Sequence, residues 1–398
     1  MATPVNLPPV HNKLAKHAAF PEFDHDETAR YNFLTNLNKH LSTVVSPGNK
    51  VAFEKRVRPQ FIADNGRDFE TPDEVKAAML QNQNYQTWSA LRRSTMEMRQ
   101  QAGRATVLRQ ADELAQKVAD LNAKSPQSLT INPDVKAPHY MTMFDSHIMP
   151  GSYHTELFPG DVSNAASYDA GLFVTSAGML GKYTDGGGKA LTTWLKSTYP
   201  DFKPKRILDI GCGLGHNTLP LALAFPDAEV VGIDTGIPMV RYGHARAVGL
   251  GVENVRFMNL DATQTGFEAE SFDWIQTTMF LHETSTQAMH KLINEIYRML
   301  RLGGLSLHIE QPQYTPQMSV YEKFIRDWDA LYNNEPFWGA MHDVDVRTWM
   351  TSAGFKEENL LQFGAKAEND MEYPKNPNAP EVEDHGRSPI WNVFGAWK

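Results

Sequence analysis

The chain of 398 residues contains a single cysteine, Cys212. One thiol excludes an internal disulfide and a metal site built from several cysteines, and it is typical of a reducing compartment. The first residues, MATPVNLPPVHNKLAKH, show no apolar core behind a basic leader, so no secretory signal is expected. These features together predict a cytoplasmic protein.

Long hydrophobic runs and an excess of basic charge are also lacking. No stretch approaches the roughly 20 consecutive apolar residues that a membrane-spanning helix needs, although 41% of the residues are hydrophobic. The formal net charge is -9 at pH 7, which provides no general electrostatic footprint for nucleic acid. We therefore expect neither a membrane nor a nucleic acid as a partner.

Apolar residues before about residue 135 recur at the helical spacing of three and four. The pattern predicts two amphipathic helices, whose apolar positions are Leu34, Leu37, Leu41 and Val44 in one and Leu108, Ala111, Leu114, Val118 and Leu121 in the other. Residues 1–140 are thus predicted to form a helical N-terminal domain. Such a domain could be a structural cap, a dimerisation surface or a part that recognises substrate.

Two local signals refine the helical prediction. In TPDE, Thr71 is expected to cap a helix, with Pro72 at its first position and Glu74 completing a capping box. The stretch from about residue 85 to 123 could form one long helix, which Gly103 would weaken by about 1 kcal/mol relative to alanine.

Short apolar runs alternate with helix-length segments from residue 205 onward. The runs read KRILDIG, AEVVGID, NVRFMNLD, FDWIQTTMF and LSLHIEQP. Strands that alternate with helices predict the α/β class, with a parallel sheet covered on both faces. Such sheets bind ligands beyond the carboxyl ends of their strands, so the residues at those ends are the candidates for function.

The segment RILDIGCGLGHNT, residues 206–218, joins a strand ending at Asp209 to a turn with Gly211, Gly213 and Gly215. Glycine permits unusual dihedral angles and lets a ligand lie against bare backbone beside a helix N-terminus, which predicts a nucleotide-like ligand. The dinucleotide pattern G-x-G-x-x-G fails because its sixth position is His216, so a nicotinamide oxidoreductase is disfavoured.

Acidic residues close the next two strands. Asp234 lies 25 residues after Asp209, at the distance where a carboxylate can accept hydrogen bonds from both ribose hydroxyls. Asp261 and Ala262 follow the third strand, in NLDAT. Asp234 alone does not distinguish one adenosine cofactor from another.

The motifs as a set resemble those of class I S-adenosylmethionine-dependent methyltransferases, most closely the ubiquinone-biosynthesis type. The D-x-G-x-G-x-G turn resembles the first signature of that family, and FDWIQTTMFLHE and RMLRLGGLSLHIE resemble its fourth and fifth strand signatures, with Leu302 in place of the usual proline. RTWMTSAGF and IWNVFGAWK extend the resemblance over residues 205–398.

The resemblance implies a seven-stranded, Rossmann-like methyltransferase sheet with S-adenosylmethionine as the cofactor. It implies further that the glycine turn cradles the methionine and ribose portions, that Asp234 binds the ribose, and that Asp261 and Ala262 lie at the adenine.

Methyl transfer from a sulfonium to a nucleophile mainly requires alignment and the exclusion of water, and an oxygen or protonated-amine acceptor also requires a general base. His282 and Glu283 follow the fourth strand, and Glu310 ends the fifth. These three are the predicted catalytic residues, with His282 preferred as the base near neutral pH. The alternative for each is a structural hydrogen bond at a strand end.

Residues 141–204 are expected to connect the two domains and to cover the active site. Tyr153 and His154 are candidate substrate contacts in this segment. The spacing between His147 and His154 is not a metal-ligand signature, so no metal site is predicted.

Residues 312–342 form an aromatic insertion that contains Tyr314, Tyr321 and Trp328 as further candidate substrate contacts. Aromatic side chains facing the cavity would suit a flat ring, or a cationic amine through cation–π attraction. Tyr321 and Trp328 also fall at helical spacing with Phe324, which would equally be explained by the apolar face of a helix. Residues 367–389 are predicted to be a surface loop, or the arm of a homodimer.

The predicted function is S-adenosylmethionine-dependent methylation of a small molecule at oxygen or nitrogen. One alternative is methylation of a protein or nucleic acid, for which the cavity would lie open beside a basic surface. The other is a scaffold that binds the cofactor without turnover.

Overall fold

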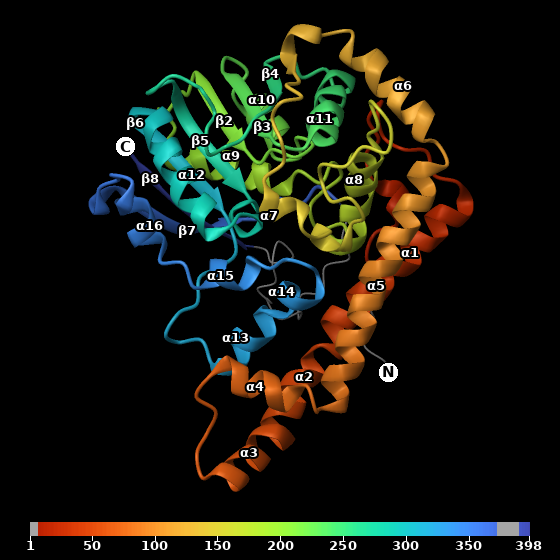
Figure 1. Cartoon of the computed structure of the whole chain (residues 1–398), viewed down its shortest axis with the longest axis vertical. Helices are drawn as coiled ribbons and strands as arrows, with labels where there is room; N and C mark the ends of the chain where they lie inside the picture. The colour runs from red at the N-terminus through yellow and green to blue at the C-terminus, as the bar shows by residue number, and fades with distance from the viewer. Residues whose placement is uncertain (1–6, 372–389) are drawn as a thin grey trace.

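A computed structural model describes residues 7–371 and 390–398 of the chain. Figure 1 shows an elongated molecule in which a long helical arm runs beside a sheet and extends beyond it. Most of the predicted loop at residues 367–389 lies outside the described residues.

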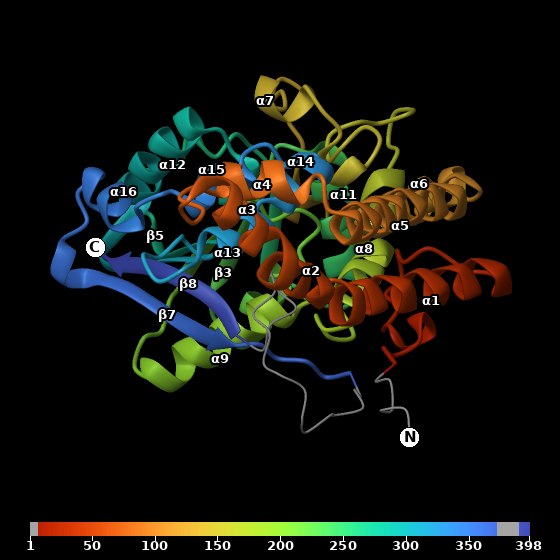
Figure 2. The same cartoon turned by 90° about the horizontal axis from the view of Figure 1, so that it is seen from below.

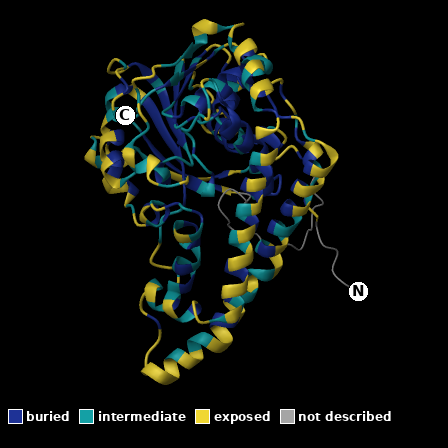
Figure 3. Cartoon of the chain, turned by 45° about the vertical axis from the view of Figure 1, so that its right-hand side comes forward, coloured by how far each residue is buried: buried dark blue, intermediate teal, exposed yellow. Residues whose placement is uncertain are grey.

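The helical arm is formed by the N-terminal part of the chain, as predicted. Its helices are α1 (His25–His40), α2 (Pro47–Ala52), α3 (Arg58–Asn65), α4 (Pro72–Met79), α5 (Gln83–Leu108) and α6 (Ala111–Asn122). The first three run on without a loop, because π-helical turns at Leu41–Val45 and Phe53–Val57 join them. Figure 3 shows that the outer faces of the arm are exposed, whereas the strands of the sheet are buried.

The predicted cap at Thr71 is present, because its Oγ1 accepts a hydrogen bond from the Glu74 backbone N–H at 3.2 Å. The capping box is incomplete, since the Glu74 carboxylate instead accepts the N–H of Glu70. The prediction of a single long helix over residues 85–123 is wrong, because the helix is interrupted between α5 and α6. There the Gln110 side chain bonds to the backbone of Glu22, which outweighs the helical propensity of the sequence.

The α/β prediction is confirmed by a sheet with the order β1-β4-β3-β2-β5-β6-β8-β7. The strands are β1 (Leu129–Thr130), β2 (Arg206–Ile210), β3 (Glu229–Asp234), β4 (Val255–Asn259), β5 (Phe272–Thr278), β6 (Leu300–Ile309), β7 (Leu360–Lys366) and β8 (Ile390–Trp397). β8 is antiparallel to both of its neighbours, and Figure 2 shows it beside β7 at the edge of the sheet. The described residues thus form eight strands rather than the predicted seven, because the short β1 pairs with β4.

Helices cover both faces of the sheet. On one face pack α9 (Gly186–Thr198), α10 (Thr218–Ala224) and α11 (Ile237–Gly249), and on the other α12 (Thr286–Met299) and α16 (Val346–Ser352). Ile207 and Leu208, consecutive on β2, enter opposite hydrophobic clusters and are both fully buried. This two-sided burial explains why the parallel strands are continuous apolar runs.

The remaining helices lie between the arm and the carboxyl edge of the sheet. They are α7 (His139–Thr142), α8 (Ser163–Ser176), α13 (Val320–Arg326), α14 (Trp328–Tyr332) and α15 (Trp338–His342). α8 packs on α5, and α13 packs on α4. Figure 1 shows α13–α15 bridging the arm and the sheet, so residues from both parts meet at the carboxyl edge.

A buried carboxylate, that of Asp169 on α8, ties four segments together. Its Oδ2 accepts hydrogen bonds from His17 Nε2 at 2.7 Å and from the Tyr242 hydroxyl at 2.9 Å. Its Oδ1 accepts a hydrogen bond from His216 Nε2 at 2.7 Å. The N-terminal segment and α11 are thereby linked through α8 to the glycine turn.

None of the helices in the described part of the chain combines the length and the apolarity that a membrane span requires.

Candidate active site

The glycine turn follows β2 and leads into α10. Gly211 and Gly213 have positive φ angles of 68° and 51°, which favour glycine. A Cβ on Gly211 would lie 2.2 Å from the Phe280 ring, whereas a Cβ on Gly213 would meet nothing within 4 Å. Gly213 therefore presents bare backbone to an open space, as a bound ligand would require.

Asp234, at the end of β3, faces the same space as Gly213. Its Oδ2 accepts the Gly213 N–H at 3.0 Å, and its Oδ1 accepts the Gly236 N–H at 2.8 Å. Burial raises the pKa of the Asp234 carboxyl above its usual value. After β4, Asp261 Oδ1 accepts the Thr263 N–H at 2.8 Å, and Asp261 and Ala262 also line this space.

Asp209 and Gly215, predicted as cofactor contacts, do not line the cavity described below. The Asp209 side chain is buried under the turn, where it accepts hydrogen bonds from Thr218 and Gln276. A Cβ on Gly215 would lie 2.8 Å from Phe257. Both residues therefore hold the turn against the sheet, because their neighbours occupy the sides on which a ligand would otherwise lie.

One cavity of about 260 Å³ extends from the glycine turn into the space between the sheet and the arm. Its cofactor end is lined by Gly211, Gly213, Asp234, Asp261 and Ala262. Its other end is lined by side chains from the covering segments and the strand ends, among them Tyr140, His147, Tyr153, Tyr168, His282, Glu283, Glu335 and Trp338.

His282 lies just after β5 and is 3% exposed. Its Nδ1 donates to Glu310 Oε1 at 2.6 Å, and its ring meets that of Trp338 edge-on at 4.9 Å. Although burial alone would lower it, the carboxylate of Glu310 raises the pKa of His282 to about 9. His282 therefore carries a proton at neutral pH, which differs from the role of unprotonated base predicted for it.

Glu310, at the end of β6, is buried and does not line the cavity. Besides His282, it accepts the backbone N–H groups of Leu281 at 2.8 Å and of Gln311 at 2.7 Å. Its geometry is that of a positioning residue, because it fixes the His282 ring and the turn that carries Glu283.

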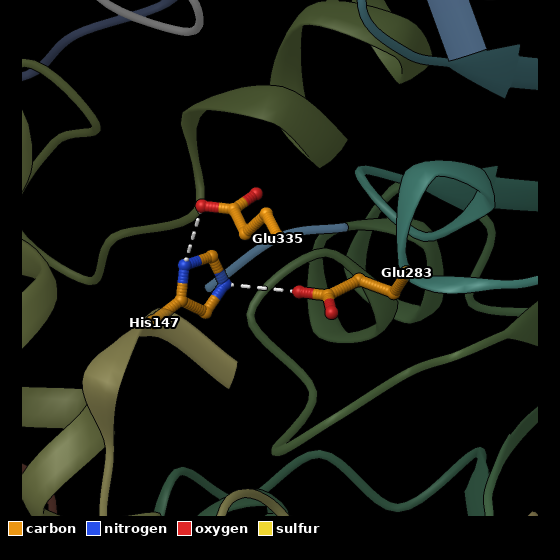
Figure 4. Close-up of side chains that lie close together, drawn as sticks. All are labelled: His147, Glu283 and Glu335. Carbon is orange, nitrogen blue, oxygen red and sulfur yellow. Dashed lines mark ion pairs between the residues drawn. The ribbon is translucent and has the colours of Figure 1, made fainter. Parts of the chain in front are cut away.

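Glu283 faces His147 across the cavity, and Glu335 approaches His147 from the other side (Figure 4). His147 Nε2 lies 2.9 Å from Glu283 Oε1, and His147 Nδ1 lies 3.0 Å from Glu335 Oε1. Although burial alone would raise it, His147 lowers the pKa of the Glu283 carboxyl to about 2. Burial raises the pKa of Glu335. The three side chains form a buried charged cluster beside the cofactor end.

The candidate substrate contacts divide into two groups. Tyr153 lines the cavity, and its hydroxyl donates to Glu283 Oε1 at 3.1 Å. The other four, His154, Tyr314, Tyr321 and Trp328, are not among its lining residues.

The apolar-face interpretation holds for Tyr321 and Trp328. Both lie in a hydrophobic cluster with residues of the arm, and the Trp328 indole N–H donates to Ser89 Oγ at 2.7 Å. Tyr314 stacks on the His342 ring with a centroid separation of 4.7 Å. Tyr321 and Trp328 thus attach the insertion to the arm, whereas Trp338, which was not among the candidate contacts, lines the cavity.

Sequence reasoning did not select His147, Tyr168, Glu335 or Trp338 as site residues. His147 and Trp338 lie in segments that were recognised as covers, but the sequence does not show which of their side chains face inward. Glu335 stands alone between α14 and α15, without any local motif. Its position is set by the packing of the insertion on the arm.

The cofactor end meets the requirements for S-adenosylmethionine. Gly213 provides an open stretch of backbone, and Asp234 provides carboxylate oxygens at the end of the adjacent strand. Asp261 and Ala262 follow β4, the next strand of the sheet, and line the same cavity. The sheet topology and these residues define a class I S-adenosylmethionine-dependent methyltransferase domain, as predicted.

Comparison with known proteins agrees with this class. Residues 207–304 match a family model described as a methyltransferase domain. The chain is 27% identical over 209 residues to phosphoethanolamine N-methyltransferase 3 of Arabidopsis thaliana, which covers 50% of this chain and 39% of that protein. It is 37% identical over 109 residues to a demethylmenaquinone methyltransferase of Thermus thermophilus. That match covers 27% of this chain and 48% of the other protein.

A solved structure is also similar. Phosphoethanolamine N-methyltransferase 2 of Haemonchus contortus, in complex with S-adenosyl-L-methionine, gives a TM-score of 0.41 at 19% identity, covering 58% of this chain and 57% of that one. The chain thus spans less than two thirds of the length of these relatives.

Proposed function

We propose that this protein transfers the methyl group of S-adenosylmethionine to oxygen or nitrogen of a small-molecule acceptor. The observation that carries the proposal is the continuity of one cavity from the glycine turn to the charged cluster. The cofactor supplies an electrophilic methyl group when bound at the turn. The protein's own residues would then align the acceptor and exclude water.

Enclosure favours a small acceptor over a macromolecule. Tyr153 and His147 line the cavity from the segment between β1 and β2, and Glu335 and Trp338 line it from the insertion. A protein or nucleic acid would need an open approach, and nucleic acid would also need a basic surface, whereas the chain has a net charge of -9.

In this proposal a carboxylate acts as the general base that removes the proton from the acceptor. His282 is already protonated at neutral pH because Glu310 raises its pKa. Glu283 and Glu335 line the same cavity, and Glu335 is the stronger base of the pair, because burial raises its pKa whereas His147 lowers that of Glu283. His282 then orients these carboxylates and stabilises their charge.

Calorimetry with S-adenosylmethionine and S-adenosylhomocysteine, with NAD as the control, tests the cofactor part of the proposal. We expect micromolar binding of the two sulfur nucleotides and none of NAD. Radiolabelled methyl transfer to panels of amines, phenols and acids then tests the acceptor part. Binding without transfer to any small molecule, together with labelling of protein or nucleic acid from a lysate, would replace the proposal by its macromolecular alternative. Binding without any transfer would support the scaffold.

Asp234→Ala should weaken S-adenosylmethionine binding by about 1–3 kcal/mol, because the ribose loses its carboxylate acceptor. The matched control is Asp227→Ala, which removes an exposed aspartate near the opposite end of β3. Calorimetric titration of both variants measures the change. Equal affinities of Asp234→Ala and the unmodified chain would remove Asp234 from the cofactor site.

We expect the protein to act in the cytoplasm, in accord with its single, buried thiol. A homodimer is a further prediction, which light scattering of the purified chain would test.

A further inference from the structure

Three side chains that are far apart in the sequence present metal-ligand atoms to one another. His147 lies between β1 and β2, Glu283 follows β5, and Glu335 lies in the insertion. One ligand atom from each lies within 4.8 Å of the other two (Figure 4). Imidazole nitrogen and carboxylate oxygen are the donors that bind zinc, manganese and iron in proteins.

The charges of this cluster do not balance by themselves. His147 lies between two carboxylates and can supply at most one positive charge to them. The other nearby imidazole, that of His282, is engaged with the Glu310 carboxylate at 2.6 Å. A buried carboxylate without a compensating charge is unfavourable, so ionisation of both glutamates would leave the site short of positive charge.

One carboxyl oxygen of Glu335 lacks a partner among the described residues. The residue is 2% exposed and lines the cavity. Its Oε1 accepts hydrogen bonds, but its Oε2 has no hydrogen-bond partner within the described part of the chain. His282 Nε2 lies 3.6 Å from this oxygen, beyond hydrogen-bond distance. A buried carboxyl oxygen without a partner in such a place points to a ligand that it would bind.

The groups around the cluster hold the prospective ligands in place. The Tyr153 hydroxyl and Ser146 Oγ donate to the two oxygens of Glu283, each at 3.1 Å. Asn333 Nδ2 donates to Glu335 Oε1. Metal-binding carboxylates and histidines in proteins are usually oriented by such outer hydrogen bonds.

We propose that His147, Glu283 and Glu335 bind one divalent transition-metal ion, of the class Mn²⁺, Fe²⁺ or Zn²⁺, in the acceptor half of the cavity. One ring nitrogen of His147 and one oxygen of each glutamate are the ligands, and the remaining positions face the cavity. Metal–ligand distances of about 2.0–2.2 Å place two ligand atoms at most about 4.4 Å apart. Side-chain rotation of the two glutamates brings the cluster within this limit.

Metal binding is measured on the full-length protein after removal of metal with a chelator. The protein is dialysed against Mn²⁺, Fe²⁺ or Zn²⁺ singly, Fe²⁺ without oxygen, and bound metal is determined by elemental analysis. Co²⁺ serves as a spectroscopic probe of the ligands. We expect one equivalent of at least one of these ions, and at least about 100-fold weaker binding in His147→Ala and Glu335→Gln.

Two matched controls remove the same residue types from exposed positions. His139→Ala lies eight residues before His147, and Glu358→Gln lies in the turn before β7. Both should bind metal as the unmodified chain does, and unchanged circular dichroism spectra and thermal unfolding would show that all variants are folded. Binding of no ion by the unmodified chain, or equal loss of binding in the controls, would overturn the proposal.

Because neither cofactor nor acceptor is needed for the measurement, this test is independent of the proposed methyl transfer. Transfer by a protein that binds no metal would reject the metal site alone. One tightly bound metal in a protein without transfer would leave the metal site in place and reject the proposed activity.

Discussion

Replacement of Asp169 by alanine is expected to lower the free energy of unfolding by about 3–5 kcal/mol, because it leaves buried partners without their common acceptor. Asp169 is 4% exposed and accepts hydrogen bonds from His17, His216 and Tyr242. Chemical denaturation followed by circular dichroism measures the change. The exposed Asp201→Ala is the control, and we expect it to stay within about 0.5 kcal/mol of the unmodified chain.

The loss of stability in Asp169→Ala is also expected to depend on pH. Although burial alone would raise it, the hydrogen bonds from His17 and His216 lower the pKa of Asp169 well below its usual value. A carboxyl with a lowered folded-state pKa stabilises the protein fully above the pKa of about 3.9 that it has in the unfolded chain, and this stabilisation is lost as the pH falls. The difference in stability between the unmodified chain and Asp169→Ala should therefore shrink below about pH 4. A difference under 1 kcal/mol at pH 7 would show that Asp169 does not tie the four segments together.

Glu283→Gln is expected to lower the rate of methyl transfer by about 100- to 10,000-fold, because it disrupts the pair of carboxylates around His147 that accepts the proton, and positioned proton transfer contributes a factor of this size. S-adenosylmethionine affinity should change little, because the Glu283 carboxylate bonds to Tyr153 and Ser146 rather than to the glycine turn. Single-turnover rates with the acceptor found in the screen measure the first quantity, and calorimetry measures the second.

Glu268→Gln, in the exposed loop before β5, is the control for Glu283→Gln. His282→Ala should act in the same direction as Glu283→Gln, since His282 and its partner Glu310 hold the turn that carries Glu283. A normal rate in Glu283→Gln would exclude the carboxylate from proton removal and leave Glu335 as the remaining candidate of the pair.

The cofactor end was accessible to prediction because its determinants are local. Gly213, Asp234 and Asp261 each lie at or within three residues of the end of a strand, and the parallel strands β2, β3 and β4 are neighbours in the sheet. A prediction of strand ends is then also a prediction of proximity. Asp209 was misplaced because the direction of its side chain depends on Thr218 and Gln276, which belong to other elements.

The acceptor end could be predicted only in part. Glu283 and Tyr153 were selected because they lie at a strand end and in a covering segment, and both line the cavity. Tyr321 and Trp328 do not, because the insertion packs its apolar helical face on the arm. Glu335 has no local signal, and it reaches the cavity only because that packing directs its part of the insertion inward.

By itself, the sequence determined the α/β class, the strands of the central sheet, the helical arm and the cofactor, because these follow from hydrophobic periodicity and from motifs within a few residues of one another. Only the tertiary structure decided that the arm and the insertion close over the carboxyl edge, and that His147 meets Glu283 and Glu335. Those contacts join residues separated by more than a hundred positions, and their geometry depends on side-chain packing across several elements at once.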